Sequence, residues 1–71
     1  ILAETLAHEI DPAATVHDLR RGRDGEVAFD VVVPYEVSLT DDEVRAALEE
    51  ALCAREPDCR PVIGVDRTYV L

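Results

Sequence analysis

The sequence of 71 residues contains no lysine, asparagine or methionine, and it has no long apolar run. No segment approaches the roughly 20 apolar residues that a membrane-spanning helix needs. No basic segment followed by an apolar one resembles a secretory signal. Hydrophobic residues nevertheless make up 48% of the chain, which is enough for a folded core and argues against disorder.

The length limits the chain to one small domain, which we assign to residues 1–71. A domain of this size buries only about 60% of its unfolded surface, so it often gains stability from a partner. The sequence begins at Ile1, without methionine, and enters a helical pattern at once. We therefore expect a soluble fragment of a longer protein.

The absence of lysine leaves arginine as the only fully charged base. Seven arginines stand against 16 carboxylates, which gives a formal net charge of −9. The negative electrostatic field of such a chain repels phosphate backbones and anionic lipids, so we expect neither nucleic-acid binding nor direct lipid binding. It also attracts cations, although plain solubility is the simpler interpretation.

Motifs that carry catalysis are absent as well. The sequence has no Ser-His-Asp order, no glycine-rich phosphate loop and no H-E-x-x-H. We therefore predict no catalytic residue and no enzyme activity. Cys53 and Cys59 are too far apart in sequence for a redox C-x-x-C pair and too few for a four-cysteine zinc site. We expect reduced thiols, with Cys53 packed against the core and Cys59 exposed in a loop.

Two segments have the apolar spacing of amphipathic helices. In residues 1–10, leucine or isoleucine recurs every four positions, and Asp11-Pro12 ends the pattern. In residues 41–54, a stripe predicted to be buried consists of Val44, Ala47, Leu48, Ala51 and Leu52. Thr40 and Glu43 form a capping box at the start of this second helix.

Three segments are typical of strands: residues 14–20, residues 26 to about 37, and residues 61–69. Residues 21–25 between the first two end in Asp-Gly, which predicts a hairpin turn. In the second strand Pro34 marks an edge, a bulge or the end of pairing. Alternation predicts that its core face consists of Val27, Phe29, Val31, Val33 and Tyr35.

These segments predict an α+β fold in the order helix, strand, strand, helix, strand, with both helices on one face of an antiparallel three-stranded sheet. No element remains to cover the other face. Its expected residues are His17, Asp30, Val32, Val62, Gly64 and Asp66. A half-apolar open face on so small a domain suggests a dimer or complex surface.

On that face, His17 and Asp66 are the side chains best suited to bind a divalent cation. Each also has an ordinary explanation. A single strand histidine is more often a hydrogen-bonded surface residue, and Asp66 has Arg67 or a turn as a possible partner. A zinc site usually has four ligands, so composition alone favours the ordinary explanation.

The segment His17-Asp18-Leu19-Arg20 is similar to the H-D-L-R sequence that opens the first strand of the cytoplasmic C-terminal domain of cation diffusion facilitator transporters. Further similarities follow in the same order along nearly the whole chain, at Gly25, residues 29–34, Ser38-Leu39 and residues 62–66. Their order and spacing together carry the resemblance.

The resemblance implies a ferredoxin-like, metallochaperone-like two-layer sandwich. It also implies that the domain follows a membrane domain that exports Zn²⁺, Mn²⁺, Fe²⁺ or a similar divalent cation in exchange for protons. The domain itself would lie on the cytoplasmic side of the plasma membrane. Its partners would be a second copy of itself and the membrane domain of the same chain.

The resemblance further implies a set of metal ligands, of which this sequence retains His17 and Asp66. The other ligand positions of the family fall on Val32, near Arg45 and on Gly64, which are not metal ligands. We therefore predict a degenerate metal-sensing site at which a divalent cation such as Zn²⁺ binds weakly or not at all. No other cofactor is expected.

Two alternatives belong to other functional classes. The first is a free-standing ferredoxin-like module that binds a metal or a small ligand on the same open face, although the metallochaperone C-x-x-C is absent. The second is a small hydrolase similar to acylphosphatases. Such an enzyme needs a positioned arginine and asparagine, and this chain has no asparagine.

Overall fold

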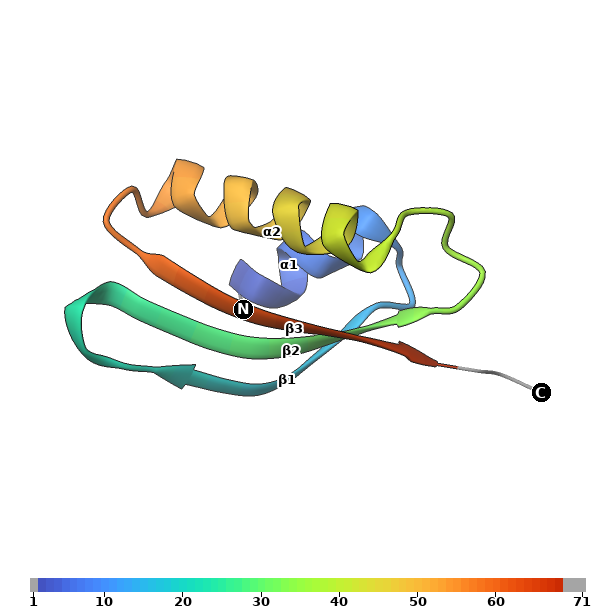
Figure 1. Ribbon diagram of the computed structural model, residues 1–71, viewed down its shortest axis with the longest axis horizontal. Coiled ribbons are helices and arrows are strands. Elements are labelled where there is room, and N and C mark those ends of the chain that lie inside the picture. The colour runs from blue at the N-terminus through green and yellow to red at the C-terminus, as the bar shows by residue number, and fades with distance from the viewer. Residues whose placement is uncertain (1, 69–71) are drawn as a thin grey trace.

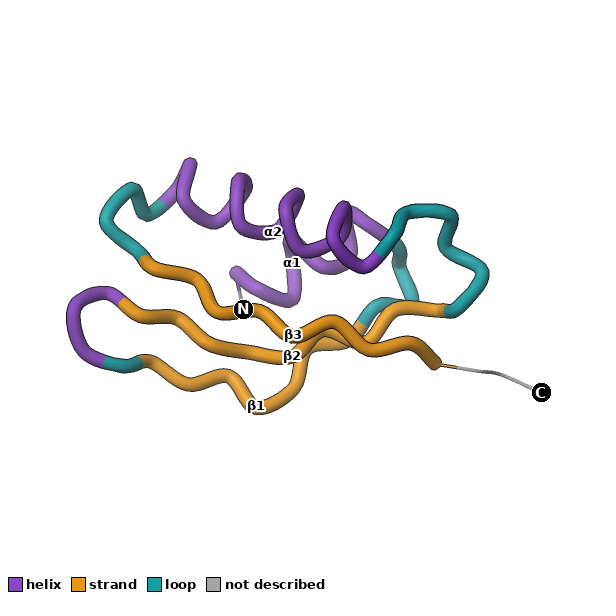
Figure 2. The backbone as a smooth tube through the Cα atoms, in the orientation of Figure 1, coloured by secondary structure: helices purple, strands orange, loops and turns teal. Residues whose placement is uncertain are grey.

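The computed structural model describes residues 2–68 as two helices and three strands in the predicted order (Figure 1). The elements are α1 (Leu2–Ile10), β1 (Thr15–Arg21), β2 (Glu26–Pro34), α2 (Asp41–Arg55) and β3 (Arg60–Thr68). Both helices cover the same face of the sheet (Figure 2). The predicted α+β two-layer sandwich is confirmed. The predicted end of the last strand, at Tyr69, lies outside the described residues.

The sheet is mixed, with β2 in the middle. β1 pairs with β2 in antiparallel orientation, whereas β3 runs parallel to β2, with Phe29 opposite Ile63. The expectation of a wholly antiparallel sheet is therefore wrong. The reason is the helical crossover: α2 carries the chain back along the sheet, so β3 begins at the same end as β2.

The hairpin between β1 and β2 closes as the Asp-Gly pair predicts. A single turn of 3₁₀ helix, Arg23–Gly25, joins the strands, and the Gly22 amide donates to the Glu26 carbonyl at 2.9 Å. Asp24 and Gly25 both have left-handed backbone angles, with φ values of 59° and 80°. Such angles favour glycine and are tolerated by aspartate.

The N-terminus of α2 has the predicted capping box. The Glu43 amide donates to Thr40 Oγ1 at 3.1 Å, and the Thr40 amide donates to Glu43 Oε1 at 2.8 Å. The buried stripe is narrower than predicted, because Ala47 is exposed and Ala51 is only partly buried. The fully buried residues of α2 are Val44, Leu48 and Leu52.

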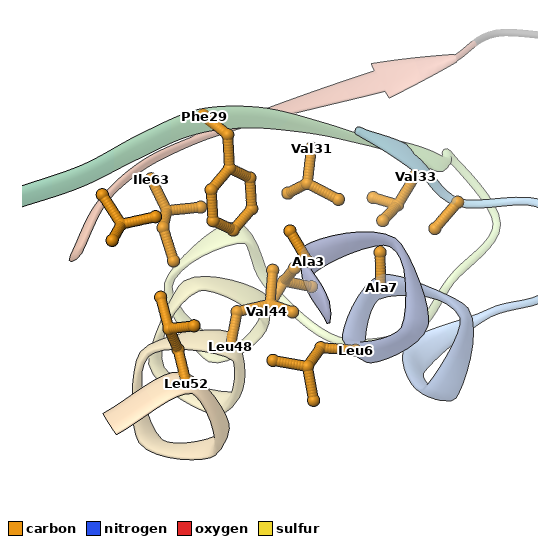
Figure 3. Packing of buried hydrophobic residues seen from close by; sticks show 12 residues of the cluster. Ala3, Leu6, Ala7, Phe29, Val31, Val33, Val44, Leu48, Leu52 and Ile63 are labelled. Carbon is orange, nitrogen blue, oxygen red and sulfur yellow. The ribbon is translucent and has the colours of Figure 1, made fainter. Parts of the chain in front are cut away.

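The core lies between the helices and β2 (Figure 3). Phe29 and Val31 of β2 pack against Leu48 of α2 and Leu6 of α1. Of the predicted core face of β2, only Tyr35 is not buried, with 57% of its surface exposed. The reason is that β2 ends at Pro34, and the chain turns away from the sheet after it.

Arg67, near the end of β3, holds the loop over residues 35–40 against the sheet. Its Nη1 donates to the carbonyls of Pro34 and Val37 at 3.3 and 3.2 Å, and its Nη2 donates to the Leu39 carbonyl. Its Nε donates to Asp41 Oδ1 at 2.8 Å. One guanidinium therefore joins the end of β2, the loop and the start of α2.

Candidate functional site

The face of the sheet that turns away from the helices is the candidate site, and we call it the open face (Figure 1). Cross-strand pairing defines its members, which are Thr15, His17, Arg20, Glu26, Ala28, Asp30, Val32, Arg60, Val62, Gly64 and Asp66. Val62 is 55% exposed, and Val32 is partly buried. Residues 2–68 enclose no pocket, so the face presents a surface and not a cavity for a small ligand.

β1 contains a bulge that the sequence did not predict. His17 pairs with Asp30 and Arg20 pairs with Ala28, so two residues of β1 stand opposite one residue of β2. Asp18 has a left-handed backbone with φ of 57°, and Leu19 is 50% exposed. The H-D-L-R segment therefore bends the edge strand.

The two predicted metal ligands lie on the open face but on opposite outer strands. His17 on β1 stands opposite Asp30 of β2, and its Nε2 lies 2.9 Å from Thr15 Oγ1. Asp66 on β3 stands opposite Val32, one row further along. Within residues 2–68, no group of three or more His, Cys, Asp or Glu side chains is arranged to hold a metal ion. The described residues of a single copy therefore offer no four-ligand zinc site. That His17 and Asp66 bind a divalent cation stays a prediction.

Asp30 fills the space that a side chain at position 64 would need. A Cβ added to Gly64 would lie 2.5 Å from Asp30 Oδ1. The resemblance implies a histidine at position 64. The Asp30 carboxylate of β2 occupies the space that this side chain would need. Arg45, at another of the family's ligand positions, donates instead to the Ile63 carbonyl at 3.0 Å and to Asp42 at 2.7 Å.

The sequence suggested Arg67 as an ion-pair partner of Asp66, but Arg67 binds Asp41 instead. Consecutive residues of a strand point to opposite faces, so Asp66 lies on the open face and Arg67 on the helix side. His8, the other histidine of the chain, belongs to α1 in the helix layer and not to the sheet.

The two cysteines lie side by side at the other end of α2. Cys53 Sγ is 3.4 Å from Cys59 Sγ, and both residues are partly buried. The expectation that Cys59 is exposed in a loop is wrong, because it packs against the hydrophobic core. Burial, the neighbouring Cys53 thiol and the Glu56 carboxylate together raise the pKa of the Cys59 thiol from 9.0 to about 11.

This raised pKa predicts a loss of stability in alkaline solution. The folded state holds the Cys59 proton more tightly than the unfolded state, so the contribution is complete below pH 9 and is lost as the pH rises through about 11. Urea unfolding between pH 8 and 11, under reducing conditions, should show a steeper decline for the native chain than for Cys59→Ser. Equal declines in the two proteins would contradict the prediction.

No helix among residues 2–68 combines the length and apolar character needed to cross a membrane. Comparisons with the known protein families, with curated proteins and with solved structures found no match for this chain.

Proposed function

We propose that this chain is a dimerisation domain whose two copies pair through their open faces. The observation that carries the proposal is the uncovered apolar surface on that face. Both helices lie on the opposite side of the sheet, and Val62 of β3 is 55% exposed beside the buried Ala28 of β2, with the partly buried Val32 further along the same face. Pairing two such faces removes apolar surface from water, at roughly 25 cal/mol per Å².

The charge of the open face permits such pairing although the chain as a whole is strongly acidic. The face carries two arginines and three carboxylates, which are Arg20, Arg60, Glu26, Asp30 and Asp66. It is therefore nearly neutral, while the whole chain has a net charge of −9. Repulsion between two copies is weakest when these faces meet.

The same charges favour a second copy over an unrelated partner. Arg20 and Arg60 lie toward the end of the sheet where β2 begins, and Asp66 lies toward the end where β2 finishes. A twofold axis that lies in the plane between the two faces and runs across their strands would set the basic end of one copy over the acidic end of the other. The face is thus complementary to itself.

The edges of the sheet are less suited to pairing than its face. On β3 the Ile63 carbonyl already accepts a hydrogen bond from Arg45. On β1 the bulge at Asp18 interrupts the regular ladder. A bulge is a common means of protecting an edge strand from further pairing, and the occupied Ile63 carbonyl leaves one acceptor fewer on the other edge.

We propose further that the domain serves on the cytoplasmic side of a proton-coupled divalent-cation efflux transporter, where it holds two protomers together. The H-D-L-R segment, the order of the elements and the position of the open face support this assignment. His17 and Asp66 are then remnants of a metal-sensing site, and two paired copies would carry four such side chains between them. The gene provides a direct test, because six membrane spans encoded upstream of Ile1 would support the assignment and a start codon immediately before it would exclude it.

A charge placed on the open face should break the dimer. We expect Val62→Glu to weaken self-association at least about tenfold, because the new carboxylate meets the acidic end of the other copy. Sedimentation velocity over a concentration series measures the effect. The matched control is Ala47→Glu, which adds the same charge on the exposed side of α2. A native chain that stays strictly monomeric at high concentration, or equal association of the two variants, would refute the proposal.

A charge exchange tests the geometry of the same dimer. Arg20→Glu and Asp66→Arg should each weaken association, and the double variant should restore it, because the opposed charges are exchanged together. Repeating the series with Zn²⁺ addresses the metal remnant, and we expect a change in the dissociation constant of less than about threefold for two ligands per copy. A large change that survives His17→Ala would show that the zinc ligands lie elsewhere.

A further inference from the structure

The crossover from α2 to β3 brings two thiols together that the sequence separates by five residues. Cys53 lies in the last turns of α2, and Cys59 immediately precedes β3. Two backbone hydrogen bonds fold the connection, from the Glu56 amide to the Leu52 carbonyl and from the Cys59 amide to the Glu56 carbonyl, both at 2.9 Å. The sulfur atoms consequently stand 3.4 Å apart.

The contacts around the connection hold it in this shape. Arg21 of β1 forms an ion pair with Glu56 at 3.4 Å. Arg60 donates to the Asp24 carbonyl at 3.2 Å and to the Arg23 carbonyl at 3.3 Å, which ties the start of β3 to the hairpin turn. The thiols are therefore positioned by contacts on both sides of the connection and not by the helix alone.

We propose that Cys53 and Cys59 are a site of reversible disulfide formation, with a low-molecular-weight disulfide as the oxidant. A disulfide bond is about 2.05 Å long, so the two sulfurs need to approach by little more than about 1 Å. Both residues are partly exposed and accessible to a small oxidant. No third His, Asp or Glu within residues 2–68 completes a metal site with the pair, which favours sulfur exchange over metal binding.

The reaction proceeds in two exchange steps. The Cys53 thiolate attacks one sulfur of the oxidant R–S–S–R, which forms a mixed disulfide and releases R–S⁻. The Cys59 thiolate then attacks the Cys53 sulfur, which forms the Cys53–Cys59 bond and releases the second R–S⁻. The two protons of the cysteines end on the two released R–S⁻ groups, which become R–SH, and two electrons pass to the oxidant. The raised pKa of Cys59 keeps that thiol protonated at neutral pH, so the second step is slow.

The bond would fasten the end of α2 to the start of β3. Because it closes a short loop that the native fold already forms, it should stabilise the folded state mainly by restricting the unfolded chain. Neither thiol belongs to the open face, because Cys53 lies in α2 and Cys59 packs against the hydrophobic core. The inference is thus independent of the proposed dimer.

Equilibration in buffers of reduced and oxidised glutathione tests the proposal. Samples are quenched with an alkylating reagent, and intact mass distinguishes the free dithiol, the mixed disulfide and the internal disulfide. We expect the effective concentration of the thiol pair in the native chain to exceed that in the guanidinium-unfolded chain about tenfold or more. An equal or lower value in the native chain would overturn the proposal, as would a product linked between two chains.

Two single variants and a stability measurement provide further checks. Cys59→Ser should accumulate the mixed disulfide at Cys53, and Cys53→Ser should react more slowly. The oxidised native chain should unfold at a higher urea concentration than the reduced one. Folding and disulfide formation form one thermodynamic cycle, so a thiol pair that is easier to oxidise in the folded chain makes the oxidised chain more stable than the reduced chain. An oxidised chain that is less stable than the reduced chain would show that the fold does not accommodate the bond.

Discussion

Replacement of Arg67 by methionine is expected to lower the free energy of unfolding by about 3 kcal/mol. The Arg67 side chain is only 16% exposed, and its guanidinium donates to three backbone carbonyls of β2 and the following loop. Methionine keeps much of the apolar volume but leaves those carbonyls without this donor. Domains of this length have a total stability of roughly 4 to 10 kcal/mol, so the loss would be a large fraction of it.

The ion pair with Asp41 contributes little to this effect. Asp41 is 52% exposed, and pairs in such a position are typically worth less than about 1 kcal/mol. Arg67→Lys separates the two contributions, because lysine keeps the charge but lacks the planar set of donors that reaches several carbonyls at once. We expect Arg67→Lys to lose most of the stability that Arg67→Met loses.

Urea unfolding followed by circular dichroism measures these differences. The matched control is Arg55→Met, since Arg55 lies exposed in the last turn of α2, outside the open face, and has no hydrogen bond or ion pair to any described residue. This control should lower the free energy of unfolding by less than about 0.5 kcal/mol. If Arg67→Met were no more destabilising than Arg55→Met, the loop over residues 35–40 would not depend on the guanidinium.

Local sequence signals predicted the elements that local interactions form. Thr40 and Glu43 satisfy each other within one helical turn, and Asp24-Gly25 has the left-handed angles that these two residue types tolerate best. The parallel direction of β3 was open to prediction too, because a helix between two neighbouring strands favours a parallel pair. The antiparallel expectation did not take this crossover into account.

The candidate site was predicted in part for the same reason. Strand alternation was enough to place His17 and Asp66 on the open face, because alternation is a local property. The bulge at Asp18 was not predicted, since it depends on how β1 meets β2. The contact of Cys53 with Cys59 depends on how the crossover folds back, which no spacing rule describes.

Gly25→Ala is expected to destabilise the fold by about 2 to 3 kcal/mol, for two separate reasons. Gly25 has a left-handed backbone with φ of 80°, which costs a residue with a Cβ about 1 to 2 kcal/mol. A Cβ at this position would also lie 2.6 Å from the backbone carbonyl oxygen of Asp58. A backbone atom cannot rotate away as a side chain can, so the hairpin turn and the connection after α2 would have to separate.

Gly22→Ala is the matched control for this prediction, because it adds the same methyl group three residues away in the same turn. Gly22 has a φ of −103°, which any residue adopts, and its nearest neighbour is the flexible Glu26 carboxylate. Gly22→Ala should lower the free energy of unfolding by less than about 1 kcal/mol. Gly25→Asn distinguishes the two causes, since asparagine tolerates left-handed angles but still brings a Cβ against Asp58. Equal urea midpoints for Gly22→Ala and Gly25→Ala would show that neither cause operates. Because Asp58 adjoins Cys59, Gly25→Ala should also lower the effective concentration of the thiol pair, and Gly22→Ala should leave it unchanged.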